Sequence, residues 1–277
     1  MRIYIRSKCV SPLVAAFLLG AALVTPVAPA AADDYQPPAI HKLLRDYEGT
    51  QTCLICHGAG GLLGHDMAAD LMNTVHWKWV HTNRAAGVTQ VMGKRNIINN
   101  YCVALASNEP RCTSCHPGLG WRDNSFDFTD ETKVDCLVCH DTTGTYRKTP
   151  TGAGMPDPTV DLAYVAMNAG RTSRATCGAC HFYGGGGDAV KHGDLDSTMQ
   201  NPTREVDVHM GVDGANMSCV DCHVSLEPGA TAHDLVGSRY SKRAPDNWLC
   251  EDCHTPTPHW TVDNGAYYNA HTGRVHT

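Results

Sequence analysis

The sequence predicts a mainly α, loop-rich fold in which short helices wrap around bound groups instead of around an ordinary apolar core. Three observations predict this fold. The pattern Cys-x-x-Cys-His occurs six times, the chain of 277 residues contains 26 glycines and 15 prolines, and aromatic residues make up only 7% of it. Glycine and proline interrupt helices and strands, so we expect little regular structure between the repeated motifs.

The repeated pattern is the attachment signature of c-type haem. Two cysteine sulfurs bond covalently to the porphyrin, and the adjacent histidine is the proximal iron ligand. A Cys-x-x-Cys pair alone also suits a zinc ribbon or a redox disulfide, but neither accounts for a histidine after every second cysteine. We therefore expect six covalently attached haem c groups that form much of the core. The motifs, first to sixth, are Cys53, Cys56 and His57; Cys112, Cys115 and His116; Cys136, Cys139 and His140; Cys177, Cys180 and His181; Cys219, Cys222 and His223; and Cys250, Cys253 and His254.

Residues 1–32 are predicted to be a secretory signal peptide. Three basic residues among the first eight precede a mostly apolar stretch from Val10 to Val24, and small residues at Ala28–Ala32 offer a cleavage site. An uncleaved membrane anchor is the alternative, and no later stretch reaches the ~18–20 apolar residues that span a bilayer. Residues 33–277 are then expected to form one multihaem cytochrome domain, periplasmic or extracellular, with about 40 residues for each motif.

Regular elements are expected at two places along the chain. Between Met67 and Asn83, apolar residues recur at every fourth position, which predicts a helix with one apolar face. Thr159–Asn168 is the second candidate helix, with Gly170 as its stop signal. The segment GAGMPDP at 152–158 predicts a loop between two haem groups, and no segment shows the alternation that is typical of a strand.

The second and third motifs are close in the sequence. Cys115 and Cys136 are about twenty residues apart, so we expect the haems that they attach to be near neighbours. Segments 118–121 and 127–128 are predicted to pack between or beside these haems. Closely spaced haems exchange electrons rapidly, which makes electron transfer the minimal function.

The iron of each haem also has a sixth position, which a second histidine can fill. Ten histidines lie outside the motifs, and six haems need at most six of them, so most haems are expected to be bis-histidine. A lone histidine is otherwise an ordinary surface or core residue. His209 and His233 flank the fifth motif. The predicted distal ligands are His41, His76, His192, His209 and His233.

Two further residues break the pattern. Cys102 is the one cysteine of residues 33–277 outside the motifs, and a lone thiol in an oxidising compartment calls for an explanation; an inert buried cysteine is the alternative. Lys191 follows four glycines at 184–187, which permit close approach to a flat macrocycle. A solvated surface charge is the alternative for this lysine.

Five segments closely resemble the octahaem tetrathionate reductase family, and the similarity extends from about His41 to His271. They are GKRNIINNYC at 93–102, SNEPRCTSCHPGLGWRDNSFDF at 107–128, VDCLVCHDTTGTYRK at 134–148, GRTSRATCGACHFYGGGGDAVKHGDLD at 170–196 and DVHMGVDGANMSCVDCH at 207–223. The resemblance implies that the second haem is catalytic and that a lysine nitrogen binds its iron. It also implies a cysteine and an asparagine in the substrate pocket. By position these residues match Lys191, Cys102 and Asn99.

The resemblance implies reduction of tetrathionate, nitrite and hydroxylamine, since the family has these activities and is related to pentahaem nitrite reductases and hydroxylamine oxidoreductases. A lysine must lose its proton to bind iron, so the site must lower its pKa. A basic pocket would attract anionic substrates, and a nearby thiol could take part in S–S chemistry. The family has eight haems whereas this chain has six motifs, so we expect either a C-terminally shortened product or a six-haem relative.

The first functional hypothesis is therefore a multihaem reductase of small sulfur or nitrogen oxyanions. Its partners would be a small anionic substrate and a redox protein such as a quinol-oxidising cytochrome, and a homo-oligomer is also compatible with it. The alternatives are a non-enzymatic electron conduit whose haems are all bis-histidine, and a remnant whose partner chain carries the last two haems. The net charge of −6 argues against nucleic acid as a partner.

Overall fold

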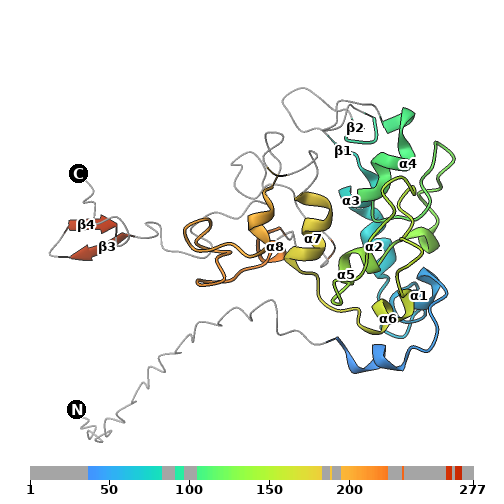
Figure 1. Ribbon diagram of the computed structural model, residues 1–277, viewed down its shortest axis with the longest axis horizontal. Coiled ribbons are helices and arrows are strands. Elements are labelled where there is room, and N and C mark those ends of the chain that lie inside the picture. Colours follow the sequence, from blue (N-terminus) through green and yellow to red (C-terminus); the bar gives the residue numbers. More distant parts are fainter. Residues whose placement is uncertain are drawn as a thin grey trace, which may run out of the picture.

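Short helices dominate the part of the chain that the computed structural model describes, which comprises residues 37–82, 91–96, 105–182, 188, 195–223, 233, 260–263 and 266–269. None of the helices in these ranges is long and apolar enough to cross a membrane. Turns and 3-10 segments join the helices, and α5 packs beside α7 (Figure 1). The α-helices are α1 (Thr50–His57), α2 (Met67–Asn73), α3 (Val75–Lys78), α4 (Glu109–Cys112), α5 (Leu137–His140), α6 (Leu162–Met167), α7 (Arg174–His181) and α8 (Cys219–Cys222). The 3-10 segments are η1 (Ala39–Leu43), η2 (Leu105–Ser107), η3 (Thr113–Cys115), η4 (Glu131–Lys133) and η5 (Ser197–Gln200).

The described ranges also contain two short antiparallel strand pairs, which the sequence analysis did not predict. Strand β1 (His81–Thr82) pairs with β2 (Val91–Met92). Strand β3 (Trp260–Asp263) pairs with β4 (Ala266–Asn269). Strands of two and four residues are too short to give a recognisable alternation, so the sequence pattern did not reveal them. The mainly α, loop-rich character is confirmed.

The helix predicted for Met67–Asn83 is divided into α2 and α3. Thr74 separates them: its backbone is extended, its hydroxyl donates to the Leu71 carbonyl over 2.7 Å, and the same oxygen accepts from the Trp77 amide. A threonine side chain that bonds to nearby backbone competes with the helix. Trp79 then ends α3 in the left-handed conformation, with φ of 51°. The i+4 spacing of apolar residues located the helices but not the break.

The second predicted helix is confirmed as α6, which is shorter than the expected Thr159–Asn168. Its first turn is capped by Asp161, whose carboxylate accepts from the Tyr164 amide over 2.9 Å. Helix α6 ends at Met167, and the side-chain amide of the next residue, Asn168, donates to the Tyr164 carbonyl over 2.8 Å. The three residues before Asp161 belong to a turn in which the Asp157 carboxylate accepts from the Thr159 amide. Local side-chain capping therefore sets both ends.

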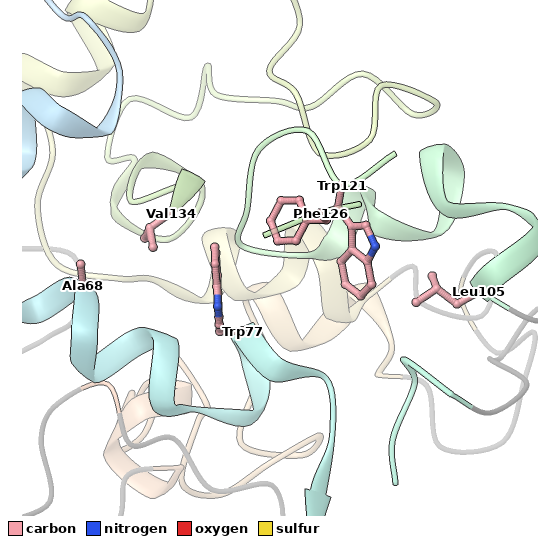
Figure 2. Close-up of a cluster of buried hydrophobic side chains, with 6 residues drawn as sticks. All are labelled: Ala68, Trp77, Leu105, Trp121, Phe126 and Val134. Atoms are coloured by element: carbon pink, nitrogen blue, oxygen red, sulfur yellow. The ribbon is translucent and has the colours of Figure 1, made fainter. Parts of the chain in front are cut away.

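The larger apolar cluster gathers around Trp77, which is fully buried (Figure 2). Figure 2 shows its indole lying between Val134 on one side and Phe126 on the other. The indole N–H donates to the Phe128 carbonyl over 2.8 Å, so its one polar atom is satisfied. The residues of the cluster are Ala68, Trp77, Leu105, Trp121, Phe126 and Val134. Trp121 and Phe126, from the segment between the second and third motifs, thus share a cluster with Trp77; their packing against haems stays a prediction.

The loop predicted at residues 152–158 packs against the second motif. Ala153 donates to the Pro110 carbonyl over 2.8 Å and accepts from the amides of Gly120 and Trp121. Gly154 has a φ of 81°, and a Cβ there would lie 2.3 Å from the Gly118 carbonyl oxygen. Only glycine fits such a close approach. The loop therefore holds the backbone on both sides of the Cys112–His116 motif.

Candidate functional site

Five of the six Cys-x-x-Cys-His motifs lie in the described residues, each on or beside a short helix. The first lies in α1, the second in α4 and η3, the third in and beside α5, the fourth at the end of α7 and the fifth in α8. Helical residues three or four apart share a face, so both cysteines of a motif point the same way and the histidine follows at once. None of the ten cysteines in these five motifs forms a disulfide. All ten are therefore available for thioether bonds.

Three motif histidines each face a second histidine from outside the motifs. The ring centroids of the three pairs are 6.2, 6.2 and 6.3 Å apart, and the ring planes are inclined by 62°, 81° and 75°. In each pair one histidine belongs to a motif and the other is one of the predicted distal ligands. The pairs are His57 with His41, His181 with His76, and His140 with His233.

The separation within these pairs fits two imidazoles that hold one iron between them. A metal–imidazole bond is about 2.0 Å long and a ring nitrogen lies about 1 Å from the ring centroid, so the expected separation is about 6 Å. The Nδ1 atom of His41 bonds to the Ala169 carbonyl over 2.8 Å, and that of His140 bonds to the Gly170 carbonyl over 2.7 Å. These bonds leave Nε2 for a metal, an arrangement typical of ligand histidines.

Burial also keeps these imidazoles in the form that binds metal. Desolvation lowers the pKa of four of the six paired histidines below the usual value, namely His57, His76, His140 and His181. A histidine must be neutral to bind a metal. A zinc ribbon would call for four Cys or His ligands at one point, and the described residues contain no group of three or more His, Cys, Asp or Glu side chains placed to hold a metal ion.

His116 of the second motif is placed differently. Its ring is fully buried, its Nε2 atom bonds to the Trp77 carbonyl over 2.7 Å, and its Nδ1 atom has no hydrogen-bond partner. A Cβ on Gly118 would lie 2.6 Å from that Nδ1 atom, so little space remains beside it. Burial is the main reason that the pKa of His116 is lowered to about 3. This arrangement does not fit an axial iron ligand, because Nε2 is taken by a backbone carbonyl.

An aromatic box encloses the imidazole of His116. The ring centroids of its members lie 4.9 to 6.0 Å from that of His116. Most of them come from the segment between the second and third motifs. They are Trp77, Trp79, Trp121, Phe126 and Phe128. No histidine from elsewhere in the described residues faces His116, so the second motif lacks the paired arrangement of the first, third and fourth.

Cysteines of different motifs come within hydrogen-bonding distance of each other. The first motif touches the third, the second touches the fourth, and the fourth touches the fifth. The contacts join Cys53 to Cys136, Cys115 to Cys180, and Cys177 to Cys219. Helices α5 and α7 pack together and so bring the third and fourth motifs side by side. The five described motifs therefore form one connected chain of neighbours.

A cavity of about 310 Å³ opens on the aromatic box. Its wall includes Trp121 and Phe128 of the box, and the Arg95 guanidinium lies 3.9 Å from the centre of the Phe128 ring. Glu109 and Asp123 also line it, so its described wall is mixed in charge rather than basic. The cavity is bordered by Asn96 and Leu105, which flank residues 97–104.

Several predicted site residues fall outside the described residues. Asn99 and Cys102 lie between Asn96 and Leu105, and Lys191 and His192 lie between residues 188 and 195. The sixth motif, Cys250, Cys253 and His254, is also outside. His209 is described: its carbonyl accepts from the Met217 amide over 2.9 Å, in the loop that leads into α8. Its role as a distal ligand stays a prediction.

Sequence reasoning missed two features of this site. It named His233 as a distal ligand without assigning it to a motif, and the structure places it against His140 of the third. It also gave no attention to Lys148, whose ammonium donates to the His116 carbonyl over 2.6 Å. Neither feature leaves a local sequence signal, because both contacts join residues that are far apart in the chain.

The comparisons with known proteins agree with this geometry. No protein-family model matches the chain. The crystal structure of octahaem cytochrome c from Shewanella oneidensis is similar, with 48% sequence identity and a TM-score of 0.67, over 79% of this chain and 48% of that one. An uncharacterised protein of Archaeoglobus fulgidus is 24% identical over 234 residues, which cover 66% of this chain and 75% of that protein. The chain thus spans about half the length of the solved structure that it matches.

The fold of this chain is that of a multihaem c-type cytochrome. The expected architecture of short helices and loops is confirmed. The 48% identity to a solved octahaem cytochrome c supports a redox role for the chain.

Proposed function

We propose that this chain is a periplasmic multihaem cytochrome that carries six covalently attached haem c groups and reduces small sulfur or nitrogen oxyanions. The observation that carries the haem and electron-transfer part is the set of three histidine pairs with centroids 6.2 to 6.3 Å apart. Each pair belongs to a different Cys-x-x-Cys-His motif. The separation within each pair matches that of two imidazoles bound to one iron, which supports these histidines as the axial ligands of three of the haems.

The contacts between motifs support electron transfer through the whole described body. Each attachment cysteine would bond to the edge of its porphyrin, so neighbouring cysteines of different motifs would bring the haems of those motifs close together. The three inter-motif contacts and the α5–α7 packing then link the second motif through the fourth to the third and the first. Electrons need no large movement of the protein along this route.

The second motif is the proposed reducing site. When bound, haem supplies the redox chemistry, and the protein contributes ligands, access and electrostatics. The Nε2 atom of His116 is bonded to a backbone carbonyl, which supports the proposal that another residue binds the iron there. The family resemblance suggests Lys191 for that role, with Cys102 and Asn99 in the substrate pocket. Tetrathionate, nitrite and hydroxylamine are the proposed substrates, and a quinol-oxidising cytochrome is the proposed electron donor.

Different residues of the chain would bind the iron, attract the substrate and exclude water at this site. Lys191 would donate a neutral amine nitrogen, which requires that the site lower its pKa. Arg95, held over the Phe128 ring beside the cavity, would attract an anionic substrate and hydrogen-bond to its oxygens. The aromatic box would keep water away from the proximal side of the second motif. An electron conduit with only bis-histidine haems is the competing function, and the three histidine pairs favour it as much as they favour the reductase.

The proposed reductase activity is tested by the oxidation of a reduced viologen dye by tetrathionate, nitrite and hydroxylamine. We expect turnover by the haem-loaded protein and a loss of at least about tenfold in Lys191→Ala, equivalent to about 1.4 kcal/mol of transition-state stabilisation. Lys78→Ala is the matched control, because Lys78 is an exposed lysine that bonds to Asn73. Turnover that is equal in both variants would rule out the lysine. If the dye fully reduces the native protein but none of the three substrates is turned over, the reductase proposal fails and the electron conduit remains.

A further inference from the structure

A buried ion pair lies between the second and third motifs. The Lys148 ammonium is 2.9 Å from the Asp135 carboxylate, and the two side chains are only 6% and 2% exposed. The other lysine and arginine ion pairs of the described residues have exposed or half-exposed partners, such as Lys133 with Asp130. A buried pair is weak evidence for stability, since its desolvation offsets its attraction. Its position therefore calls for another explanation.

Each end of this pair is attached to a different haem motif. The Lys148 ammonium donates to the carbonyl of His116, the last residue of the second motif, over 2.6 Å. Asp135 directly precedes Cys136, the first residue of the third motif, and accepts from the Tyr146 hydroxyl over 2.6 Å. The positive end is thus fixed at one haem attachment site and the negative end at the next.

We propose that the Lys148–Asp135 pair is a fixed dipole that raises the reduction potential of the haem at the second motif and lowers that of the haem at the third. This inference rests on the proposed haem attachment but not on the proposed reductase activity. A nearby cation stabilises the iron that has gained an electron, and a nearby anion stabilises the iron that has lost one. The field acts strongly because the site is dry.

The reach of the two charges supports this division. The ammonium lies at the His116 carbonyl of the second motif, and the carboxylate accepts from the Val138 amide inside the third motif over 3.2 Å. The dipole therefore points from the third motif to the second, and it would draw electrons from the third haem towards the second. The second haem is also the proposed reducing site.

The test is a spectroelectrochemical titration of haem-loaded protein with both charges removed, in Lys148→Met combined with Asp135→Asn. Removing both leaves no unpaired charge in the interior. We expect at least one midpoint potential to fall and at least one to rise, each by about tenfold in the one-electron equilibrium constant, or about 59 mV. The surface pair gives the matched control, because Lys133→Met combined with Asp130→Asn removes the same charges where solvent screens them.

Two further variants keep the inference testable if the double variant does not fold. Asp135→Asn keeps the hydrogen-bond acceptor, and potentials should then only rise. Lys148→Arg keeps the charge and should preserve the native order of potentials. Unchanged potentials in the double variant, or shifts in one direction only, would overturn the dipole. Native protein without attached haem would instead defeat the proposed function.

Discussion

Replacing Trp77 with alanine is expected to lower the free energy of unfolding by about 3–5 kcal/mol, the usual cost of truncating a buried tryptophan. Trp77 is fully buried, and its ring packs on His116, Phe126 and Phe128. The alanine variant also leaves the Phe128 carbonyl without its donor. The cavity would open directly beside the second motif, so the environment of His116 should change together with stability.

Chemical denaturation of haem-loaded protein, followed by circular dichroism, measures this loss. Leu62→Ala is the control, because Leu62 is 82% exposed and its truncation should change stability by less than about 0.5 kcal/mol. Trp77→Phe separates packing from hydrogen bonding, because it keeps an aromatic ring in the cluster but removes the indole N–H. The lost hydrogen bond should lower the free energy of unfolding by about 1 kcal/mol, in addition to the loss from the smaller ring. A Trp77→Ala variant as stable as Leu62→Ala would contradict the described core.

Replacing Arg174 with methionine is expected to release the loop that leads into the fifth motif. Arg174 begins α7 and is only 6% exposed. Its guanidinium donates to the carbonyls of Met210 and Met217 over 2.8 Å and to the Asn216 side chain over 2.7 Å. Hydrogen bonds from a charged donor contribute about 1.5–3 kcal/mol each, so losing this set should cost about 3 kcal/mol or more.

Limited proteolysis with a thermal melt measures the release. We expect cleavage within residues 201–217 to become much faster in Arg174→Met. Arg171 is the matched control, since it lies three residues earlier, is half exposed and pairs with Asp221 over 3.6 Å. Arg171→Met should change stability by less than about 1 kcal/mol, as is usual for a surface ion pair. Equal behaviour of the two variants would show that the loop is held in another way.

The haem motifs and the general fold could be predicted from the sequence because covalent attachment imposes a local pattern of residues. Helix α6 could also be predicted, because it is a short apolar helix, and Asp161 caps it. The division of α2 from α3 could not be predicted, because apolar spacing does not report how the Thr74 hydroxyl competes for backbone groups. The expectation of a single helix there followed the spacing and was wrong.

The distal histidine ligands of the haem irons could be predicted from the sequence only as a set of candidates. His41, His76 and His233 were all among them, but which motif each one faces depends on contacts between distant segments. The bond from His116 Nε2 to the Trp77 carbonyl was also beyond the sequence, because its motif is identical in form to the others. Nothing in the sequence marks Lys148 and Asp135 as a buried pair between two motifs, because that position depends on the fold.

The most direct test of the account is the ligation state of the irons, measured by absorption and electron paramagnetic resonance of oxidised, haem-loaded protein. In the native protein we expect low-spin signals from bis-histidine haems and one distinct signal from the second motif. His41→Ala should convert one low-spin haem to high spin, whereas His65→Ala, at an exposed histidine that bonds to Asp70, should leave the spectrum unchanged. A His41→Ala spectrum identical to that of native protein would contradict the paired-histidine sites on which the account depends.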